Sequence, residues 1–200
     1  DFFETGIEHG TITARLDDKN FEITSLRKDV STDGRHAKVE FTNEWTEDAL
    51  RRDFTINSIY ADKDGNLFDP NDGVKDLERG KVEFIGDPEQ RVKEDYLRIL
   101  RYIRFFLNYS KQDHGLNVKK IIKQNISGVT KLSKERLIDE LKKLVISSGF
   151  IKICDDEFCK EILLLIFPQV KNIDIIKKIK KNYKKELFNK DFIFLLSLLI

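Results

Sequence analysis

Apolar and polar residues alternate with a period of two in the first third of the chain. Residues 10–16 are GTITARL and residues 21–27 are FEITSLR, and both segments are rich in β-branched types. The DDKN stretch between them is typical of a turn, so the pattern predicts a β-hairpin. The polar stretch from Arg27 to Phe41 contains Gly34 and predicts a mobile loop.

Farther along the chain, the apolar spacing becomes helical. Residues 46–61 (TEDALRRDFTINSIYA) place Leu50 and Phe54 one turn apart and have acidic residues near the start, which predicts a helix. Residues 88–109 are more strongly amphipathic and predict one continuous helix. The apolar stripe of that helix consists of Leu97, Leu100, Ile103 and Phe106. Further segments with helical spacing are residues 117–126, 133–148, 159–167, 173–188 and 192–200.

The change of period predicts an α+β protein whose second half is all helical. Charge divides the chain in a similar way. Residues 1–100 carry 15 basic and 24 acidic side chains, whereas residues 101–200 carry 21 and 11. One interpretation is a part that handles metal or nucleotide beside a part that binds a polyanion. The other is a lysine-rich composition on solvated helix faces.

The cysteines and the apolar runs bear on metal binding, on membrane insertion and on the extent of the protein. Cys154 and Cys159 are the only cysteines and have no histidine near them in the sequence, so two reduced core thiols are a better interpretation than a metal site. The longest apolar run, residues 192–200, is far shorter than the roughly 20 residues that span a bilayer, so we expect no membrane partner. Because the chain opens directly on a strand pattern and stops inside this run, we expect a fragment of a longer protein.

A first candidate site is a charged group beside the apolar sequence FTIN. Arginine presents planar, permanently charged donor forks that suit phosphate oxygens. Asp53 can accept hydrogen bonds from ribose hydroxyls, and Asn57 can orient it. The alternative is local pairing, such as Asp48 with Arg52, on an ordinary helix. The group consists of Asp48, Arg51, Arg52, Asp53 and Asn57.

A second candidate site consists of Glu94, Asp95 and Arg98, followed by Arg101 and Arg104. A carboxylate and a guanidinium one turn apart offer an acceptor beside a donor fork, which matches the hydrogen-bonding pattern of a nucleobase edge. The alternative is an Asp95–Arg98 salt bridge within the helix, worth roughly a few tenths of a kcal/mol. Three arginines in series with little compensating acid favour a bound polyanion.

Metal-binding signals are weak. Glu22 in the second predicted strand could ligate a hard divalent cation, but one carboxylate is not a metal site, and an exposed strand residue is the alternative. His9, His36 and His114 form no recognisable cluster in the sequence.

Six motifs follow one another along the chain: TGIEHGTITARL, FEITSLRKDVSTDGRHAKVEF, EDALRRDFTINSIY, GNLFDPNDGVKDL, GDPEQRVKEDYLRILRYIRFF and SKERLIDELKKL. In combination, they resemble those of the class II tRNA nucleotidyltransferases. These are the CCA-adding enzymes, which share a family with bacterial poly(A) polymerases. The resemblance runs from about Thr5 to about Leu144, and the pairing of RRDFTIN with EDYLRILRYIRF is highly specific. The segment around the predicted loop is more similar to mitochondrial and α-proteobacterial-like CCA enzymes than to poly(A) polymerases.

This resemblance implies roles for the candidate residues. Arg52 and Asp53 would contact triphosphate and sugar. Asp95 and Arg98 would form a protein template that reads the Watson–Crick edge of incoming CTP or ATP, and the SKERLIDELKKL helix would brace it. Further nucleotide-binding positions would be Asn57, Arg101 and Arg104, with Asp48, Arg51 and Glu94 in support. A flexible loop containing Arg27, Asp29 and Arg35 would help the switch from C to A addition.

The implied architecture is a polymerase-β-like head followed by a helical neck and a partial body. The expected boundaries are residues 1–62 for the head, 63–147 for the neck and 148–200 for the body. The implied partners are CTP, ATP and the tRNA 3′ end, with tRNA phosphates on the basic second half. The expected location is the cytoplasm of a bacterium, or a mitochondrion or other organelle of a eukaryote.

One departure from the family is large. The family begins with a Gly-Gly or Gly-Ser motif followed by a paired Asp-x-Asp that binds two Mg²⁺ ions, and this combination does not occur in these 200 residues. Glu22 could be a third carboxylate of that cluster but cannot replace the pair. We therefore expect the chain itself to bind nucleotide poorly and to be inactive, and the complete protein to be a Mg²⁺-dependent CCA-adding enzyme. The alternatives are a poly(A) polymerase, or a non-catalytic RNA-binding protein.

Overall fold

The first strands of the computed structural model form a small antiparallel sheet. The structure describes residues 1–6, 10–33, 36–178 and 191–200. The sheet has the order β1 (Phe2–Gly6), β2 (Thr11–Leu16) and β3 (Lys19–Thr24). Strands β2 and β3 pair from Thr11↔Thr24 to Leu16↔Lys19. Asp17 and Asp18 between them have φ angles of 48° and 61°, which suits a tight hairpin turn. The predicted hairpin is confirmed.

The predicted loop after this sheet is a second hairpin instead. Strand β4 (Arg27–Asp33) pairs antiparallel with β5 (His36–Phe41), with an irregularity between Asp29 and Ser31. The prediction of a loop without regular structure is therefore wrong. The polar composition concealed the strands because the ladder hydrogen bonds come from the backbone and need no apolar side chains.

The prediction of one helix over residues 46–61 is also wrong in extent. Helix α1 (Trp45–Leu50) ends before the two arginines, and a 3₁₀ turn, η2 (Thr55–Asn57), follows. Between them the backbone is extended and pairs with residues 83–85: Thr55 N donates to Glu83 O and Ile85 N donates to Asp53 O, both at 3.0 Å. Phe54 is fully buried there. Tertiary pairing thus overrides the helical spacing.

Short elements connect this region to the helical part. Strands β6 (Tyr60–Ala61) and β7 (Leu67–Phe68) pair with each other, and helix α2 (Gly73–Arg79) follows. The sequence did not predict α2. Its first N–H groups donate to the carboxylate of Asp69 at 2.8 and 2.9 Å. A Cβ at Gly73 would lie 2.2 Å from the Thr55 carbonyl oxygen, so this close approach requires glycine.

The long helix predicted over residues 88–109 is two helices, α3 (Pro88–Glu94) and α4 (Leu97–Tyr109). They are separated at Asp95, whose φ of −152° and ψ of 106° are extended. The apolar stripe predicted for this segment is buried, and it lies entirely on α4. The expectation of one unbroken helix is therefore wrong at Asp95, the position of a predicted site residue.

The described part of the second half is helical, as predicted. Ser133 caps the helix that follows it and accepts from Arg136 N at 3.5 Å. The predicted helix over residues 173–188 lies partly outside the described residues. The elements are α5 (Leu116–Asn125), η3 (Ile126–Lys131), α6 (Lys134–Val145), η4 (Ser148–Cys154), α7 (Glu157–Ile166), α8 (Ile175–Lys178) and α10 (Phe192–Leu199).

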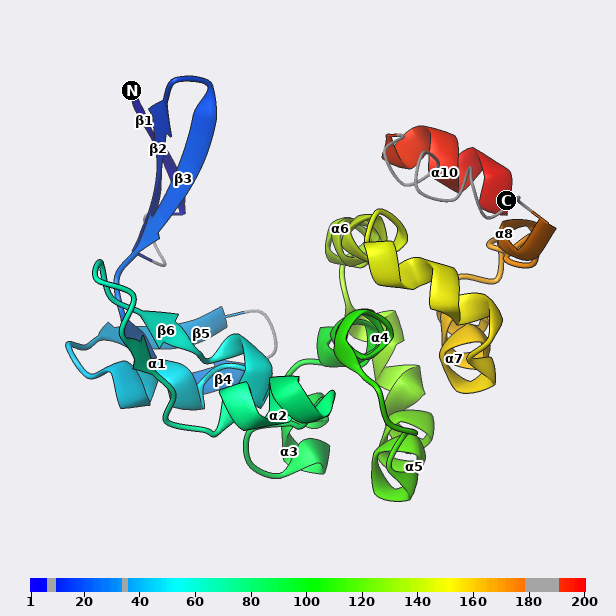
Figure 1. Cartoon of the computed structure of the whole chain (residues 1–200), viewed down its shortest axis with the longest axis horizontal. Coiled ribbons are helices and arrows are strands. Elements are labelled where there is room, and N and C mark those ends of the chain that lie inside the picture. The colour runs from blue at the N-terminus through cyan, green and yellow to red at the C-terminus, as the bar shows by residue number, and fades with distance from the viewer. Residues whose placement is uncertain (7–9, 34–35, 179–190) are drawn as a thin grey trace.

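Helix α4 is the centre of the packing. In Figure 1 it lies between the α1–α3 region and the helices α6, α7 and α8, while the β1–β3 sheet projects away from both. Ile99, Leu100 and Ile103 on α4 are fully buried, and the core continues into Phe54 and Phe84 on the other side. This arrangement brings the turn after α1 against α4. Within the described residues, no helix has the length and apolar character needed to cross a membrane.

Candidate functional site

Asp48 is the centre of a buried charged network at the end of α1. Its side chain is 1% exposed, and one carboxylate oxygen accepts from Arg51 Nε and Nη2 at 2.8 and 2.6 Å. The other oxygen accepts from Arg52 Nη2 at 3.0 Å and from the Tyr60 hydroxyl at 2.7 Å. Burial alone would raise the pKa of Asp48, but hydrogen bonds from Tyr60 and Arg51 outweigh it and lower that pKa to about 2. The local Asp48–Arg52 pair is thus present, as part of a larger network.

Asp53 connects this turn to α4. One oxygen accepts from Arg101 Nε, and the other accepts from the Asn57 amide and from the Phe54 N–H. Burial would raise the pKa of Asp53, but hydrogen bonding and charge from Arg101, with the Asn57 bond, lower it. Asp53 is therefore a buried, ionised anchor, and it brings together two further residues of the predicted site.

Arg91, a residue that sequence reasoning did not select, fastens the same turn to α3. Its Nη2 donates to the carbonyl oxygen of Arg51 at 2.8 Å and to that of Arg52, and its Nη1 donates to Glu94 at 2.7 Å. The Arg91 side chain is 12% exposed. An arginine on an amphipathic helix normally faces solvent, so no local sequence pattern indicates this role.

Asp95 and Arg98 are held by different partners. Arg98 Nη1 donates to Glu94 and to the Arg91 carbonyl oxygen, both at 2.7 Å. Asp95 instead accepts from Arg136 Nη2 on α6 at 2.7 Å. The Arg98 N–H donates to the Asp95 carbonyl oxygen at 3.0 Å, but in the part of the chain that the structure describes the two side chains form no ion pair. The predicted alternative of a helix salt bridge between them is therefore wrong.

Helix α6 braces α4 at a second point. Arg104 Nε donates to Glu140 at 2.5 Å, and the Glu140 side chain is 2% exposed. The Arg104 guanidinium also lies 4.7 Å from the Phe105 ring centre. Arg136 and Glu140 both lie in the SKERLIDELKKL segment, so the contacts expected of a bracing helix are present.

The arginines and carboxylates of this site form one cluster, and its positive charges outnumber its negative charges. Asp48 pairs with two arginines, Asp53 with one and Glu94 with two, so five guanidinium groups against three carboxylates leave two positive charges. Among the described residues, the buried Nε of Arg52 has no hydrogen-bond partner. The side chains of Arg52 and Arg101 are 38% and 30% exposed, so this surplus reaches solvent. Such an arrangement suits an anion. The five arginines are Arg51, Arg52, Arg91, Arg98 and Arg101.

The remaining predicted residues lie on the strands or outside the described residues. Glu22 is exposed on β3, opposite Thr13. Arg27 starts β4, where its N–H donates to Asp48 at 3.2 Å and its carbonyl oxygen accepts from Arg51 at 3.1 Å. The backbone of Asp29 lies in β4. Arg35 lies outside the described residues.

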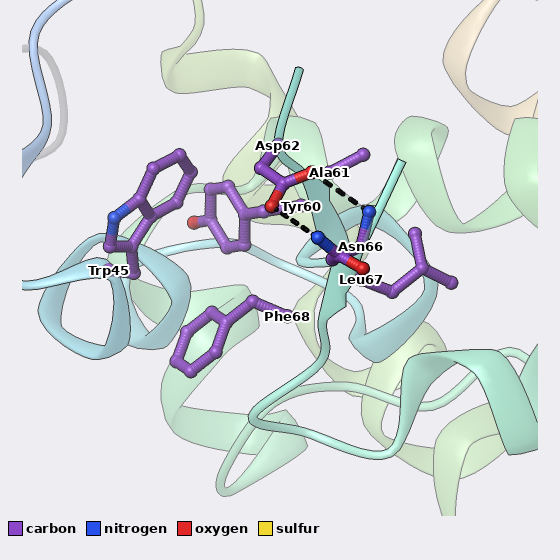
Figure 2. A pocket seen from close by; sticks show the side chains of 7 residues that line it. All are labelled: Trp45, Tyr60, Ala61, Asp62, Asn66, Leu67 and Phe68. Atoms are coloured by element: carbon purple, nitrogen blue, oxygen red, sulfur yellow. Dashed lines mark hydrogen bonds between the residues drawn. The ribbon is translucent and has the colours of Figure 1, made fainter. Parts of the chain in front are cut away.

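A small aromatic pocket of about 250 Å³ adjoins the Asp48 network. Trp45 and Tyr60 meet edge to face with ring centres 4.9 Å apart (Figure 2). Tyr60 belongs to both features, because its hydroxyl donates to Asp48. Burial, together with the hydrogen bond to Asp48, raises the pKa of Tyr60 to about 12. The lining residues are Trp45, Tyr60, Ala61, Asp62, Asn66, Leu67 and Phe68.

Comparison with known proteins places this arrangement in a family. Residues 1–83 match the family model described as the poly A polymerase head domain. The chain is 52% identical to the human mitochondrial CCA tRNA nucleotidyltransferase 1 over 145 residues, which are 72% of the chain. The chain belongs to the family of class II CCA-adding enzymes. A bacterial member, the CCA-adding enzyme of Lactobacillus johnsonii, is 37% identical over 150 residues, 73% of this chain.

The fold also agrees with this family. The CCA-adding enzyme of Bacillus stearothermophilus, solved in complex with CTP, superposes with a TM-score of 0.68 at 22% identity, over 98% of this chain and 54% of that one. At that identity the match supports the fold alone. The chain spans 33% of the human relative and 37% of the Lactobacillus johnsonii relative, so it corresponds to about a third of these CCA-adding enzymes.

Proposed function

We propose that the whole protein is a CCA-adding tRNA nucleotidyltransferase, which adds C, C and A to the tRNA 3′ end from CTP and ATP. The observation that carries the proposal is the cluster formed by the buried turn after α1 with α3 and α4, which has two surplus positive charges. A nucleoside triphosphate would neutralise that surplus. The 52% identity to a mitochondrial CCA tRNA nucleotidyltransferase supports the same substrates.

In this proposal, the turn binds the phosphates and the sugar. Arg52 contacts the triphosphate with the donors that Asp48 leaves free. An ionised carboxylate has about four acceptor sites, and Asp53 uses three of them within the chain, so one is left for a ribose hydroxyl. Asn57 orients Asp53, and Arg101 adds positive charge beside it.

The base is read by Asp95 and Arg98. Each is already held by a partner, Arg136 for Asp95 and Glu94 for Arg98, which limits the conformational entropy lost when a base is bound. Arg98 uses one Nη atom for its contacts within the chain, so further donors are left for a base edge. Arg104, held by Glu140, contributes charge from the same helix.

Other residues of the charged network support the nucleotide-binding residues. Asp48, Arg51 and Glu94 hold the turn and α3 in register. The β4–β5 hairpin, which contains Arg27, Asp29 and Arg35, is proposed as the element that helps the switch from C to A addition. The backbone N–H of Arg27, the first residue of the hairpin, donates a hydrogen bond to Asp48, so movement of the hairpin would also shift the turn.

The family is one of metal-dependent nucleotidyltransferases, and we propose Mg²⁺ as the metal of the whole protein. Paired carboxylates are needed for a two-metal site. Across the described ranges, Glu22 belongs to no group of three or more side chains that could hold a metal ion. The residues described do not fit a Mg²⁺ site by themselves, and no step is assigned to them through that metal.

For the whole protein, the proposed parts are a head over residues 1–62, a neck over residues 63–147 and the start of a body over residues 148–200. The proposed partner is the tRNA 3′ end. The vertebrate relatives are named as mitochondrial, which supports a mitochondrial location if the source is a eukaryote. The cytoplasm is proposed if the source is a bacterium.

The decisive assay is nucleotide incorporation into a tRNA that lacks its CCA end. With Mg²⁺, the full-length protein is expected to add two C residues from CTP and then one A from ATP, as read by sequencing the product. Addition of A alone would instead identify a poly(A) polymerase, a possibility that the matched head domain also allows. Failure to incorporate either nucleotide would support a non-catalytic RNA-binding protein.

A further inference from the structure

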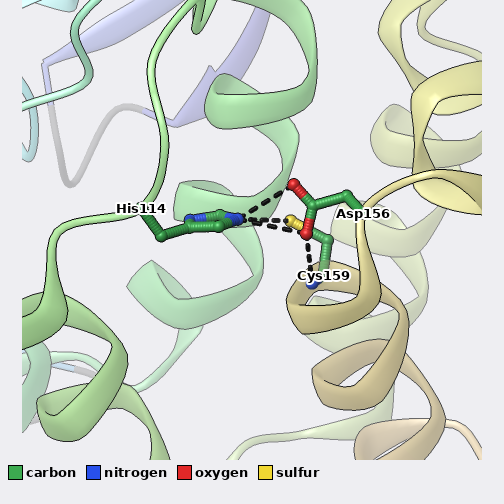
Figure 3. Close-up of side chains that lie close together, drawn as sticks. All are labelled: His114, Asp156 and Cys159. Carbon is green, nitrogen blue, oxygen red and sulfur yellow. Dashed lines mark hydrogen bonds and ion pairs between the residues drawn. The ribbon is translucent and has the colours of Figure 1, made fainter.

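Three side chains of different chemistry converge beside Tyr102 and Phe106 of α4. They are separate from the nucleotide cluster, which consists of the five arginines and three carboxylates that are proposed to bind nucleotide. His114 lies in the segment between α4 and α5, Asp156 caps the N-terminus of α7, and Cys159 lies in the first turn of α7. His114 Nε2 is 2.9 and 3.1 Å from the two Asp156 oxygens and 3.6 Å from Cys159 Sγ. Figure 3 shows the imidazole edge pointing at both side chains. The spacing of 45 residues between His114 and Cys159 concealed this group in the sequence.

The three side chains lie in mostly apolar surroundings, and one side of the group is near solvent. The side chain of His114 is 5% exposed, Cys159 is fully buried, and Asp156 is 19% exposed. The imidazole stacks on Phe106 with ring centres 3.5 Å apart and meets the edge of Phe158. Such surroundings strengthen any charge interaction inside the group, and Asp156 provides the route by which an ion could enter.

The nitrogen–sulfur separation matches that of two ligands around one ion. Tetrahedral Zn²⁺ bonds histidine nitrogen at about 2.0–2.1 Å and cysteine sulfur at about 2.3 Å. Those bond lengths put nitrogen and sulfur about 3.5 Å apart, and the observed distance from Nε2 to Sγ is 3.6 Å. One ligand atom from each residue lies within 4.8 Å of the others.

Partners around the group hold two ligands in place. The Tyr102 hydroxyl lies 3.0 Å from His114 Nδ1. When Nε2 binds a metal, the Nδ1–H group can donate a hydrogen bond to this hydroxyl oxygen, which fixes the orientation of the ring. Asp156 Oδ1 accepts from the Cys159 N–H at 2.8 Å, which leaves Oδ2 directed at His114. The helix cap and a metal bond can thus exist together on one carboxylate.

We propose that His114 Nε2, Asp156 Oδ2 and Cys159 Sγ bind one Zn²⁺ ion, with a water molecule on the exposed side as the fourth ligand. The set of one nitrogen, one oxygen and one sulfur suits a borderline-soft cation and not Mg²⁺, which prefers oxygen ligands. The ion would join the segment after α4 to the start of α7. This site is independent of the nucleotide cluster and of the proposed activity.

Without metal, burial raises the pKa of the Cys159 thiol, so the sulfur is protonated. A bound cation reverses that preference and stabilises the thiolate, and the thiol proton leaves to the buffer.

The test is Co²⁺ binding to the 200-residue chain after treatment with a chelator. We expect one equivalent to produce a thiolate-to-Co²⁺ charge-transfer band with visible ligand-field bands, and Zn²⁺ but not excess Mg²⁺ to remove them. Cys159→Ser should abolish the charge-transfer band. Cys154→Ser is the matched control, because the chain has only these two cysteines, and it should leave the band unchanged. Tyr102→Phe should weaken binding by about 10- to 100-fold.

X-ray absorption at the zinc edge of the unmodified chain gives a second readout that needs no variant. One sulfur at about 2.3 Å with nitrogen or oxygen in the remaining positions would support the site. Absence of a charge-transfer band in the folded chain, its survival in Cys159→Ser, its loss in a folded Cys154→Ser, or a zinc shell without sulfur would overturn it.

Discussion

At the scale of single residues, the nucleotide cluster depends on carboxylates that stay ionised although they are buried. Asp48 and Asp53 are 1% and 4% exposed, and burial alone would favour their neutral forms. Hydrogen bonds from Tyr60 and the arginines reverse that preference and lower both pKa values. The ionised carboxylates in turn fix the arginine forks that are proposed to meet the nucleotide.

The Asp48 pKa leads to a pH-dependent prediction. Its folded value of about 2 lies below the ordinary value of 3.8, so its contribution to the free energy of unfolding is present above about pH 4 and is lost as the pH falls toward 2. That contribution is about 2 kcal/mol. In Asp48→Asn the stability should be lower at neutral pH by a similar amount, and this part of the acid dependence should disappear, as measured by urea unfolding at a series of pH values.

Asp64→Asn is the matched control for that measurement. Asp64 is exposed, and among the described residues its side chain pairs with its exposed neighbour Lys63 alone, so the substitution should change stability by less than about 1 kcal/mol. An Asp48→Asn protein that loses stability between pH 4 and 2 as steeply as the unmodified chain would contradict the account of this carboxylate.

Residue spacing predicted the local pairs of the site but not the distant ones. Asp48 with Arg52 and Asp53 with Asn57 are four residues apart, and both pairs are present although the second is not on an α-helix. The bond between Asp53 and Arg101 joins residues 48 apart, and no sequence period encodes such a contact. Arg91 was not selected for the same reason, because its partners include backbone carbonyl groups of the distant turn.

At the scale of elements, the main departures from prediction are interruptions of helices at the site. Helical spacing continues through Asp53 and through Asp95, yet both residues lie where the helix has stopped. At the first position the backbone pairs with residues 83–85, and at the second the Asp95 carboxylate reaches Arg136 on α6. Tertiary contacts therefore decide the conformation where local propensity is permissive. The β2–β3 hairpin and the amphipathic stripe of α4 followed the sequence pattern more closely, whereas the β4–β5 hairpin did not.

Arg91 provides the prediction at this scale, because it ties the turn after α1 to α3. In Arg91→Met the two carbonyl oxygens of the turn and Glu94 lose a charged donor, so the free energy of unfolding should fall by about 1–3 kcal/mol. Amide hydrogen exchange should rise in residues 51–55 more than in α6. Lys93→Met on the same helix is the matched control. Within the described residues, the Lys93 side chain pairs with the exposed Glu89, so this substitution should destabilise the protein much less than Arg91→Met. Equal effects of the two substitutions would contradict a linking role for Arg91.

At the scale of the whole molecule, the two halves of the chain differ in charge and meet at α4. The acidic half contains the turn with the arginine cluster, whereas the basic half follows α4 as a helical array. This division fits a part that binds nucleotide next to a part that binds RNA phosphates with strong salt dependence. Composition alone left a solvated lysine-rich face as an equal possibility. The sequence motifs and the 52% identity to a CCA enzyme favour the functional interpretation.

The central claim is that the protein itself reads the incoming base. It is tested most directly by measuring kcat/KM for CTP, ATP, UTP and GTP with the full-length protein and its Arg98→Ala variant. The account predicts that selectivity for CTP and ATP falls by about 10- to 100-fold, because a base-edge donor is lost. Arg79→Ala, on the exposed surface of α2, should retain full selectivity. An Arg98→Ala enzyme that is slower but equally selective would contradict the claim.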